Sequence, residues 1–293
     1  MRAVTVGFAK GKVDKKGDRS CIFIFEGQNM YPILKIFGRE ISTYTVLGLI
    51  GVFIGIMTAN IRAKKSDIDF AEILSLGAYG TIGALIGARV FSFITQIPEI
   101  ITGIIKSELT FMLFIRRYIL VGGLVFYGGL AGAVAAVYLY CRYIGLPKEK
   151  VFILFITVLP LVHVFGRIGC FLGGCCYGIE LPPPFGIKVT LPLAGIENMY
   201  LFPVQLAESF FNIIIFIVLW MYTKKDKKLI NVICLYGLLY APIRFFLEFL
   251  RGDAVRGFVF FLSVSQVISL AAVIVILTIL SILRINIIKR RGA

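Results

Sequence analysis

Long apolar segments alternate with short polar ones along most of the chain. A helix needs about 20 mainly apolar residues to cross the hydrocarbon core of a bilayer. The candidate spans are Ile41–Asn60, Ala71–Thr95, Val121–Cys141, Val151–Phe165, Leu201–Tyr222, Leu229–Leu250 and Phe258–Leu283. The fourth is shorter, but it can extend into Gly166–Leu172. The pattern predicts an all-α integral membrane protein, a bundle of about seven transmembrane helices.

The segments between the spans predict one single domain over residues 30–293. Ile100–Leu120 is apolar but interrupted by charges, and we expect an interfacial arm around 96–120 rather than an eighth span. An ordinary connecting loop is the alternative. A second connection, around 173–200, is expected to form a loop outside the membrane.

Basic residues gather in alternate short loops and in the tail, and this asymmetry predicts the orientation. Loops that stay in the cytoplasm carry an excess of Lys and Arg, which places the C-terminus in the cytoplasm and the N-terminus outside. The residues concerned are Arg62, Lys64, Lys65, Arg142, Lys148, Lys150, Lys224, Lys225, Lys227, Lys228, Arg284, Lys289, Arg290 and Arg291.

Residues 1–29 conflict with that orientation, because a segment rich in Lys and Arg resists translocation. We interpret them as a polar leader that is not translated, with Met30 as the start. A genuine polar tail is the alternative.

The composition agrees with a membrane setting. Hydrophobic residues make up 59% of the 293 residues and charged residues 16%, which excludes an ordinary soluble domain. The net charge of +15 does not indicate nucleic-acid binding, because Lys and Arg stand in short clusters between apolar runs.

Ionisable residues inside predicted spans are costly and therefore mark candidate sites. With the predicted orientation they fall near the outer ends of the helices. Salt bridges between helices, for example Arg244 with Glu208, are one reading. A surplus of arginines suits a phosphate instead, and a phospholipid head group is the nearest abundant one. The set is Tyr44, Arg89, Arg167, Glu208, Arg244, Glu248, Arg251 and Asp253.

Glycines fall into two groups with different expectations. In the third span, close helix packing is the preferred reading of Gly122, Gly123, Gly128, Gly129 and Gly132. In the fourth, glycines are expected to break the helix and expose backbone N–H groups that could bind an anion. That group is Gly166, Gly169, Gly173, Gly174 and Gly178.

One histidine and three cysteines complete the candidate chemistry. His163, the only histidine, stands four residues before Arg167; a buried hydrogen-bonded role and a catalytic role are both open. A disulfide of Cys170 with Cys175 or Cys176, or other redox chemistry, is possible at the outer face. We predict no metal site, because further ligands are scarce, and no cofactor.

Several spaced motifs together resemble the prolipoprotein diacylglyceryl transferase family. The Gly-Arg-x-Gly signature runs from Gly166 to Gly178, and Pro-x-Gln-Leu-Tyr-Glu corresponds to Pro203–Glu208 with Gln205. Tyr-x-x-x-Arg-Phe-x-x-Glu-Phe-x-Arg corresponds to Tyr240–Arg251, and Ser-x-x-Gln to Ser263–Gln266. Tyr44 and Gly87-Ala-Arg89 also fit, and the resemblance covers about Ile33 to Leu283 in order.

The resemblance implies a reaction at the outer face of the bacterial cytoplasmic membrane. The diacylglyceryl group of phosphatidylglycerol would pass to the thiol of a lipobox cysteine in a prolipoprotein signal peptide, with release of glycerol phosphate. Arg167 and Arg244 would hold the phosphate, with Glu248, Tyr127 and His163 as further catalytic candidates. The resemblance and the charge pattern together give these substrate-binding candidates: Tyr44, Arg89, Gly128, Gly129, Gly169, Gln205, Glu208, Tyr240, Arg251, Asp253 and Gln266.

The chain departs from the family at positions expected to take part in acid–base catalysis. The family's His-Gly-Gly reads Tyr127-Gly128-Gly129, and a tyrosine of ordinary pKa, about 10, is a poor base at neutral pH. Cys170, Gly173 and Cys175 stand at the signature's usual Asn and Glu positions, and Ala207 replaces a Tyr. The base is therefore open. The alternatives are a related lipid transferase with another acceptor, or a non-catalytic phospholipid-binding, anion-binding or transport protein.

Overall fold

The structure, a computed structural model, describes residues 33–36, 39–63, 68–105, 110–114, 125–191, 194–253 and 258–291. The predicted leader 1–29, the proposed start at Met30, and residues 106–109 and 115–120 of the predicted arm lie outside these residues. Gly122 and Gly123 of the third predicted span also lie outside them.

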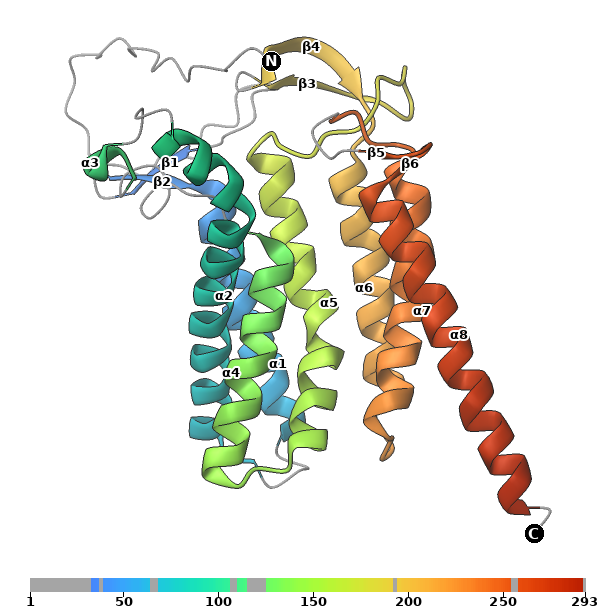
Figure 1. Ribbon diagram of the computed structural model, residues 1–293. Helices are drawn as coiled ribbons and strands as arrows, with labels where there is room; N and C mark the ends of the chain where they lie inside the picture. The colour runs from blue at the N-terminus through green and yellow to red at the C-terminus, as the bar shows by residue number, and fades with distance from the viewer. Residues whose placement is uncertain are drawn as a thin grey trace.

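Long helices aligned along a common direction dominate the described chain (Figure 1). Only α3 is short, a single turn at Phe111–Phe114. The long helices are α1 (Thr43–Ala63), α2 (Phe70–Ile105), α4 (Phe126–Ile144), α5 (Lys148–Leu172), α6 (Val204–Tyr222), α7 (Leu229–Glu248) and α8 (Val264–Arg291).

Six of these helices are long and apolar enough to cross a membrane: α1, α2, α5, α6, α7 and α8. The prediction of an all-α, multi-pass membrane protein is confirmed. The third predicted span corresponds to α4, which is rich in Gly, Ala and Tyr and is not among the six. It nevertheless lies in the bundle beside α2 (Figure 1).

Two predictions about the helices were wrong, the end of the second span and the break in the fourth. Helix α2 continues to Ile105, about ten residues past the predicted end at Thr95, with Pro98 inside it. Helix α5 runs unbroken through Gly166 and Gly169 to Leu172, so the fourth span is not broken at these glycines. At Gly169 the absence of a side chain serves packing, because a Cβ there would lie 3.2 Å from Cα of Tyr44 on α1.

Helices α2 and α4 approach through their backbones. Gly83 and Gly87 on α2 face Gly128 and Gly132 on α4. On each helix the two glycines are four residues apart, about one helical turn. A Cβ at Gly87 would lie 2.3 Å from the carbonyl oxygen of Gly128, and one at Gly132 2.1 Å from that of Gly83. Small residues at this spacing allow van der Waals contact between membrane helices, which confirms the predicted close packing of α4.

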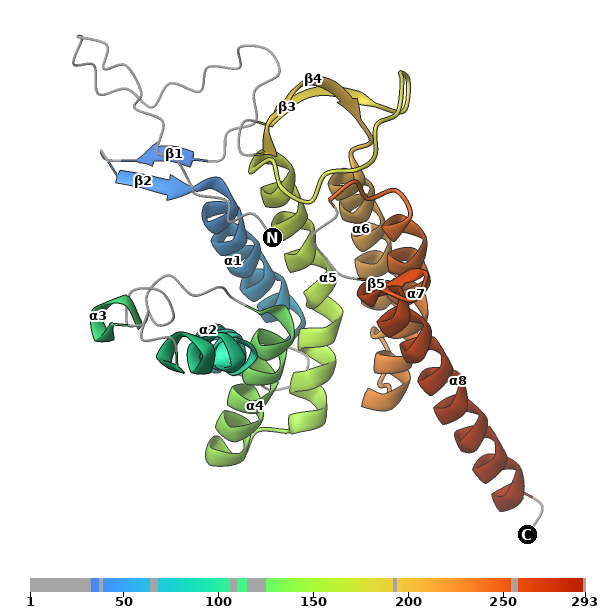
Figure 2. The same cartoon turned by 45° about the horizontal axis from the view of Figure 1, so that its top comes forward.

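Three antiparallel hairpins lie at one end of the bundle, where α1, α6 and α8 begin (Figures 1 and 2). They are β1 (Ile33–Ile36) with β2 (Arg39–Ser42), β3 (Ile187–Leu191) with β4 (Ile196–Leu201), and β5 (Phe258–Val259) with β6 (Leu262–Ser263). The β3–β4 hairpin occupies the connection predicted as an outer loop and arches over the ends of α5 and α6 (Figure 2).

Helix α5 contacts both halves of the bundle. Its first turns bury Val151 and Leu154 in an apolar cluster with Ala59 of α1, Leu76 of α2 and Val137 of α4. A second apolar cluster joins α6 and α7. Toward its C-terminal end, α5 instead presents polar side chains to α6 and α7, and there the candidate site is found.

Candidate active site

A buried carboxylate on α6 is the centre of the polar cluster. The Glu208 side chain is 1% exposed, and its Oε2 lies 2.5 Å from Nη2 of Arg167 on α5. Nη1 of Arg244, on α7, lies 4.0 Å from the same oxygen. A carboxylate so deeply buried is stable only when cations and hydrogen bonds compensate it. Glu208 therefore links three helices by charge.

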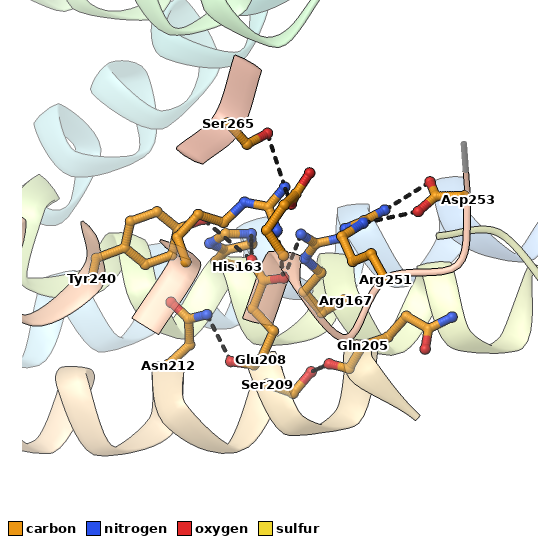
Figure 3. Close-up of polar contacts among 12 residues, drawn as sticks. His163, Arg167, Gln205, Glu208, Ser209, Asn212, Tyr240, Arg251, Asp253 and Ser265 are labelled. Carbon is orange, nitrogen blue, oxygen red and sulfur yellow. Dashed lines mark hydrogen bonds and ion pairs between the residues drawn. The ribbon is translucent and has the colours of Figure 1, made fainter. Parts of the chain in front are cut away.

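The other oxygen of Glu208 faces two aromatic side chains. The Tyr240 hydroxyl donates a hydrogen bond to Oε1 at 3.2 Å, and Nε2 of His163 lies 3.6 Å from the same atom. Figure 3 shows His163, Arg167 and Tyr240 turned toward Glu208 from the neighbouring helices. His163 thus belongs to the cluster, one turn before Arg167, as the spacing predicts.

Arg244 connects this cluster to α8. Its Nη2 lies 2.6 Å from Oε2 of Glu248, one turn further along α7, and donates to the Ser265 hydroxyl at 3.2 Å. Ser265 is not among the candidates predicted from the sequence. It stands inside the Ser263-x-x-Gln266 motif, which was its only local signal.

Buried polar side chains flank Glu208 along α6. Gln205, Ser209 and Asn212 are each buried to at least 95%. The Ser209 hydroxyl donates to the carbonyl of Gln205 at 2.9 Å, and the Asn212 amide donates to that of Glu208 at 2.8 Å. Sequence reasoning missed Ser209 and Asn212, although polar residues at helical spacing in an apolar span were the available signal.

A cavity of about 430 Å³ opens beside the cluster. Its lining comes from five helices and is more apolar than polar, as suits a lipid. The lining residues are Tyr44, Tyr127, His163, Gly166, Arg167, Cys170, Tyr240, Ala241, Arg244, Ser265, Ile268, Ser269 and Ala272. Tyr44, Tyr127, His163, Arg167, Tyr240 and Arg244, all predicted from the sequence, are thus brought together at one cavity.

Two guanidinium nitrogens at this cavity lack hydrogen-bond acceptors. They are Nε of Arg167 and Nη1 of Arg244, both buried. A buried donor without an acceptor costs about 1–3 kcal/mol. The arrangement is stabilised when an anion supplies oxygen atoms, and guanidinium groups match phosphate oxygens in geometry.

A second arginine pair lies just beyond the end of α7. Nε and Nη2 of Arg251 both donate to the Asp253 carboxylate at 2.9 Å, a two-bond pairing. Burial lowers the pKa of Arg251, but the Asp253 hydrogen bond and the nearby Cys176 thiol together keep it above its usual value. The backbone of Arg251 also bridges to Gly178 at the end of the Gly-Arg-x-Gly signature.

Gly178 has a steric reason to be glycine. A Cβ there would lie 2.3 Å from the carbonyl oxygen of Phe202 and 2.8 Å from that of Leu250. Three backbone segments, from the ends of α5, α6 and α7, meet at this point. The contact fixes the loop after α5 against the polar cluster.

The three cysteines of the signature converge after α5. Their Sγ atoms all lie within 4.8 Å of one another, and none of the described cysteines forms a disulfide. The disulfide left open by the sequence is therefore not formed in this structure. Cys170 is buried and lines the cavity, whereas Cys175 is exposed. Three sulfur ligands at these separations could hold a soft metal ion, which the sequence analysis did not expect.

Four predicted binding residues have other surroundings. Arg89 lies half-buried on α2 and is not among the residues that line the cavity. Gly128 and Gly129 are buried against α2, which gives them a packing role. Both functional groups of the Gln266 side chain are engaged: Oε1 accepts from the backbone N–H of Ser263 at 2.9 Å, and Nε2 donates to the carbonyl of Phe245 at 3.5 Å.

The Ser263–Gln266 motif forms a capping box at the start of α8. The Ser263 hydroxyl accepts from the Gln266 backbone N–H at 3.2 Å, while Gln266 bonds back to the Ser263 N–H. This reciprocal pair satisfies two N–H groups that a helix start leaves unpaired. Its effect on the site is indirect, because it fixes Ser265 beside Arg244.

Comparisons with known proteins identify the family of the chain. The family model for prolipoprotein diacylglyceryl transferase matches residues 32–282. The chain belongs to this family. A phosphatidylglycerol–prolipoprotein diacylglyceryl transferase of Clostridium tetani is 34% identical over 250 residues, 84% of this chain and 95% of the relative.

Two further relatives carry the same name. That of Finegoldia magna is 32% identical over 241 residues, 82% of this chain and 90% of the relative. That of Thermotoga maritima is 30% identical over 243 residues, 79% of this chain and 78% of the relative. The motifs that carry the family resemblance contribute Arg167, Glu208 and Arg244, which form the core of the buried cluster.

Proposed function

We propose that the chain transfers the diacylglyceryl group of phosphatidylglycerol to the thiol of a cysteine in a prolipoprotein and releases glycerol phosphate. The observation that carries this proposal is the pair of buried arginines at the cavity, each with a nitrogen that has no hydrogen-bond acceptor. Family membership and the names of the relatives support the lipid and the class of acceptor. The lipobox and the signal-peptide helix are finer parts of the same proposal.

Arg167 and Arg244 bind the phosphate of the lipid and stabilise charge on the departing glycerol phosphate. Fixed donors aimed at developing charge in a water-poor site lower the barrier more than the same groups would in water. Glu208 orients both guanidinium groups, and Glu248 with Ser265 fixes Arg244 from its other side. Tyr44, Tyr127 and Tyr240 offer hydroxyl groups to the head group.

The same end of the bundle faces outward in this proposal. The lysine-rich loops gather at the opposite end, which the positive-inside rule assigns to the cytoplasm. The acyl chains lie between the helices around the apolar part of the cavity, and the precursor enters from the membrane. The reaction then takes place at the outer face of the bacterial cytoplasmic membrane.

The test uses purified protein in lipid nanodiscs with phosphatidylglycerol labelled in its head group and a lipobox peptide. We expect a thioether-linked diacylglyceryl peptide by mass spectrometry and an equal amount of glycerol phosphate. Arg167→Ala should lower the rate by at least about 100-fold, since it removes a transition-state contact.

The matched control is Lys150→Ala, a cation on the same helix but at its other end, which should leave the rate unchanged. If the wild-type protein binds the lipid and forms neither product, the proposed transfer is wrong and the chain is a lipid-binding relative.

A further inference from the structure

The three cysteines after α5 converge although their positions in the chain would separate them. Cys170 belongs to the last turn of α5, whereas Cys175 and Cys176 are adjacent residues in the following turn. Side chains of adjacent residues ordinarily point apart. Here Gly174 and Cys176 both have positive φ, 69° and 59°, and this backbone turns the thiols inward. A non-glycine residue in this conformation costs energy, so surrounding contacts hold the convergence in place.

Several contacts fix this turn. The backbone N–H of Cys175 donates to the carbonyl of Cys170 at 3.0 Å. The Gln205 amide, from α6, donates to the carbonyl of Cys175 at 2.8 Å. The cysteine cluster is therefore tied to the same helix that carries Glu208, and Cys170 itself lines the cavity.

The donor set indicates which metal fits. Three thiolates select soft or borderline ions, of which Zn²⁺ binds sulfur at about 2.3 Å. Tetrahedral geometry then requires sulfur atoms about 3.8 Å apart, as that bond length implies. The three Sγ atoms lie within 4.8 Å of one another, so they must approach by at most about 1 Å to meet that spacing. Three protein ligands leave one position of a zinc site open, which is the arrangement of catalytic rather than structural zinc.

We propose that Cys170, Cys175 and Cys176 bind Zn²⁺ and that its open fourth position takes the thiolate of the acceptor cysteine. This inference rests on the proposed function, because the acceptor there is a thiol. It also supplies a way to deprotonate the acceptor in a chain that has Tyr127 where the family has a histidine. A thiol attacks as thiolate, and coordination to zinc deprotonates it without a strong base.

The acceptor thiol binds zinc in place of a water, and its proton passes to solvent water. The bound sulfur then forms a bond to the glycerol carbon that carries the phosphate ester. The carbon–oxygen bond breaks, and its electron pair leaves with glycerol phosphate at Arg167 and Arg244. The thioether is neutral and a weak ligand, so it dissociates and water returns to the zinc.

The charges around the cluster favour this arrangement. A zinc ion with four thiolates carries a formal charge of −2, which needs nearby cations in a low-dielectric place. The Arg251 guanidinium lies beside Cys176, and Arg167 stands one turn before Cys170. Arg167, which binds the lipid phosphate in the proposed function, thus also compensates the metal centre, together with Arg251.

Cobalt spectroscopy tests the site independently of transfer. The protein is purified without oxygen in detergent, and Co²⁺ replaces the metal; sulfur-to-cobalt charge-transfer bands are then expected. A lipobox peptide should raise their intensity by about one third, as the ligands go from three thiolates to four. The same peptide with serine in place of cysteine should leave the bands unchanged.

Cys176→Ala should abolish the charge-transfer bands, with thioether formation falling at least about tenfold, as expected when the metal is lost. Cys234→Ala, which removes a buried thiol on α7 far from the cluster, should retain both. Absence of the bands in the wild-type protein would overturn the proposal. So would a disulfide found by mass spectrometry in protein that is active without metal.

The two proposals fail separately. If the wild-type protein transfers lipid and Cys176→Ala does so at the same rate, the zinc proposal is wrong and the transferase stands. If the cobalt bands respond to the peptide thiol but no thioether forms, the metal–thiol site stands and the transferase does not.

Discussion

Positive charge gathers at both ends of the bundle, but it is buried at one end and exposed to solvent at the other. At one end Arg167 and Arg244 are about 90% buried and held by Glu208 and Glu248. At the other, a wider cavity of about 660 Å³ is lined by Arg62, Glu149, Lys150, Lys224, Lys225, Asp226, Lys227 and Lys228, most of them exposed.

This difference indicates what each group of charges can do. Lysines in water are strongly hydrated and screened by salt, so they orient a membrane protein without fixing a ligand. Buried arginines have given up hydration and are held in place by carboxylates, so an anion that reaches them meets donors already oriented. The size of a cavity is thus a poorer guide to chemistry than the burial of its charges.

The largest expected effect is at the arginine end. Glu208→Gln leaves the buried Arg167 guanidinium without its carboxylate and Arg244 with Glu248 alone, which should lower the free energy of unfolding by about 3–5 kcal/mol. Thermal unfolding in detergent measures this. Glu149→Gln, an exposed carboxylate at the lysine end, should change it by less than about 1 kcal/mol. Equal effects of the two variants would contradict the comparison.

A smaller effect is expected where charge is kept but geometry is changed. Arg244→Lys retains a cation and loses the planar fork that reaches Glu248 and Ser265. We expect transfer to fall about 10–100-fold, because lysine does not replace a two-point contact. Lys227→Arg at the other end is the matched control and should leave kcat/KM unchanged. A fully active Arg244→Lys protein would show that charge alone suffices.

One arginine at the lysine end is held by direct contacts and should behave differently from the lysines. Arg62 donates to the Thr223 hydroxyl and to the carbonyl of Trp220 at 2.7 Å, and its guanidinium stacks 4.2 Å from the Trp220 ring. Arg62→Ala should cost about 1–2 kcal/mol of stability and leave transfer per folded molecule intact. Arg142→Ala, an exposed arginine on α4, is the control. A loss of transfer with Arg62→Ala at unchanged stability would mean that this end also serves the reaction.

The smallest effect belongs to the exposed lysines. Lys224→Gln with Lys225→Gln should change the free energy of unfolding by less than about 0.5 kcal/mol and leave transfer in detergent unchanged. Both are read by the same unfolding and thioether assays. A fall comparable to that of Arg244→Lys would assign lipid-phosphate binding to the lysine end.

Much of the fold was predictable because membrane spans are a local property. About 20 apolar residues lower their free energy in lipid whatever their neighbours are, so the sequence placed α1, α5 and α7 to within a few residues. The predicted break within α5 was wrong for a physical reason. The helix continues through Gly166 and Gly169, because backbone groups in lipid need intrahelical hydrogen bonds and α1 packs against Gly169.

The candidate site was predictable in its residue types and less so in its contacts. Arg167, Glu208 and Arg244 are conspicuous because ionised groups are rare at membrane depth. That Glu208 is the shared partner depends on how α5, α6 and α7 are rotated about their axes. Ser209, Asn212 and Ser265 were missed because neutral polar residues are weaker signals.

The sequence by itself determined the helices, their membrane setting, and the presence of a few costly charges, because each of these follows from the free energy of transferring a local segment into lipid. Only the tertiary structure decided that Arg167 and Arg244 share Glu208 at one cavity, and that three cysteines meet beside it. Those contacts depend on helix rotation and on a left-handed turn at Cys176, and both are set by packing between segments distant in the chain.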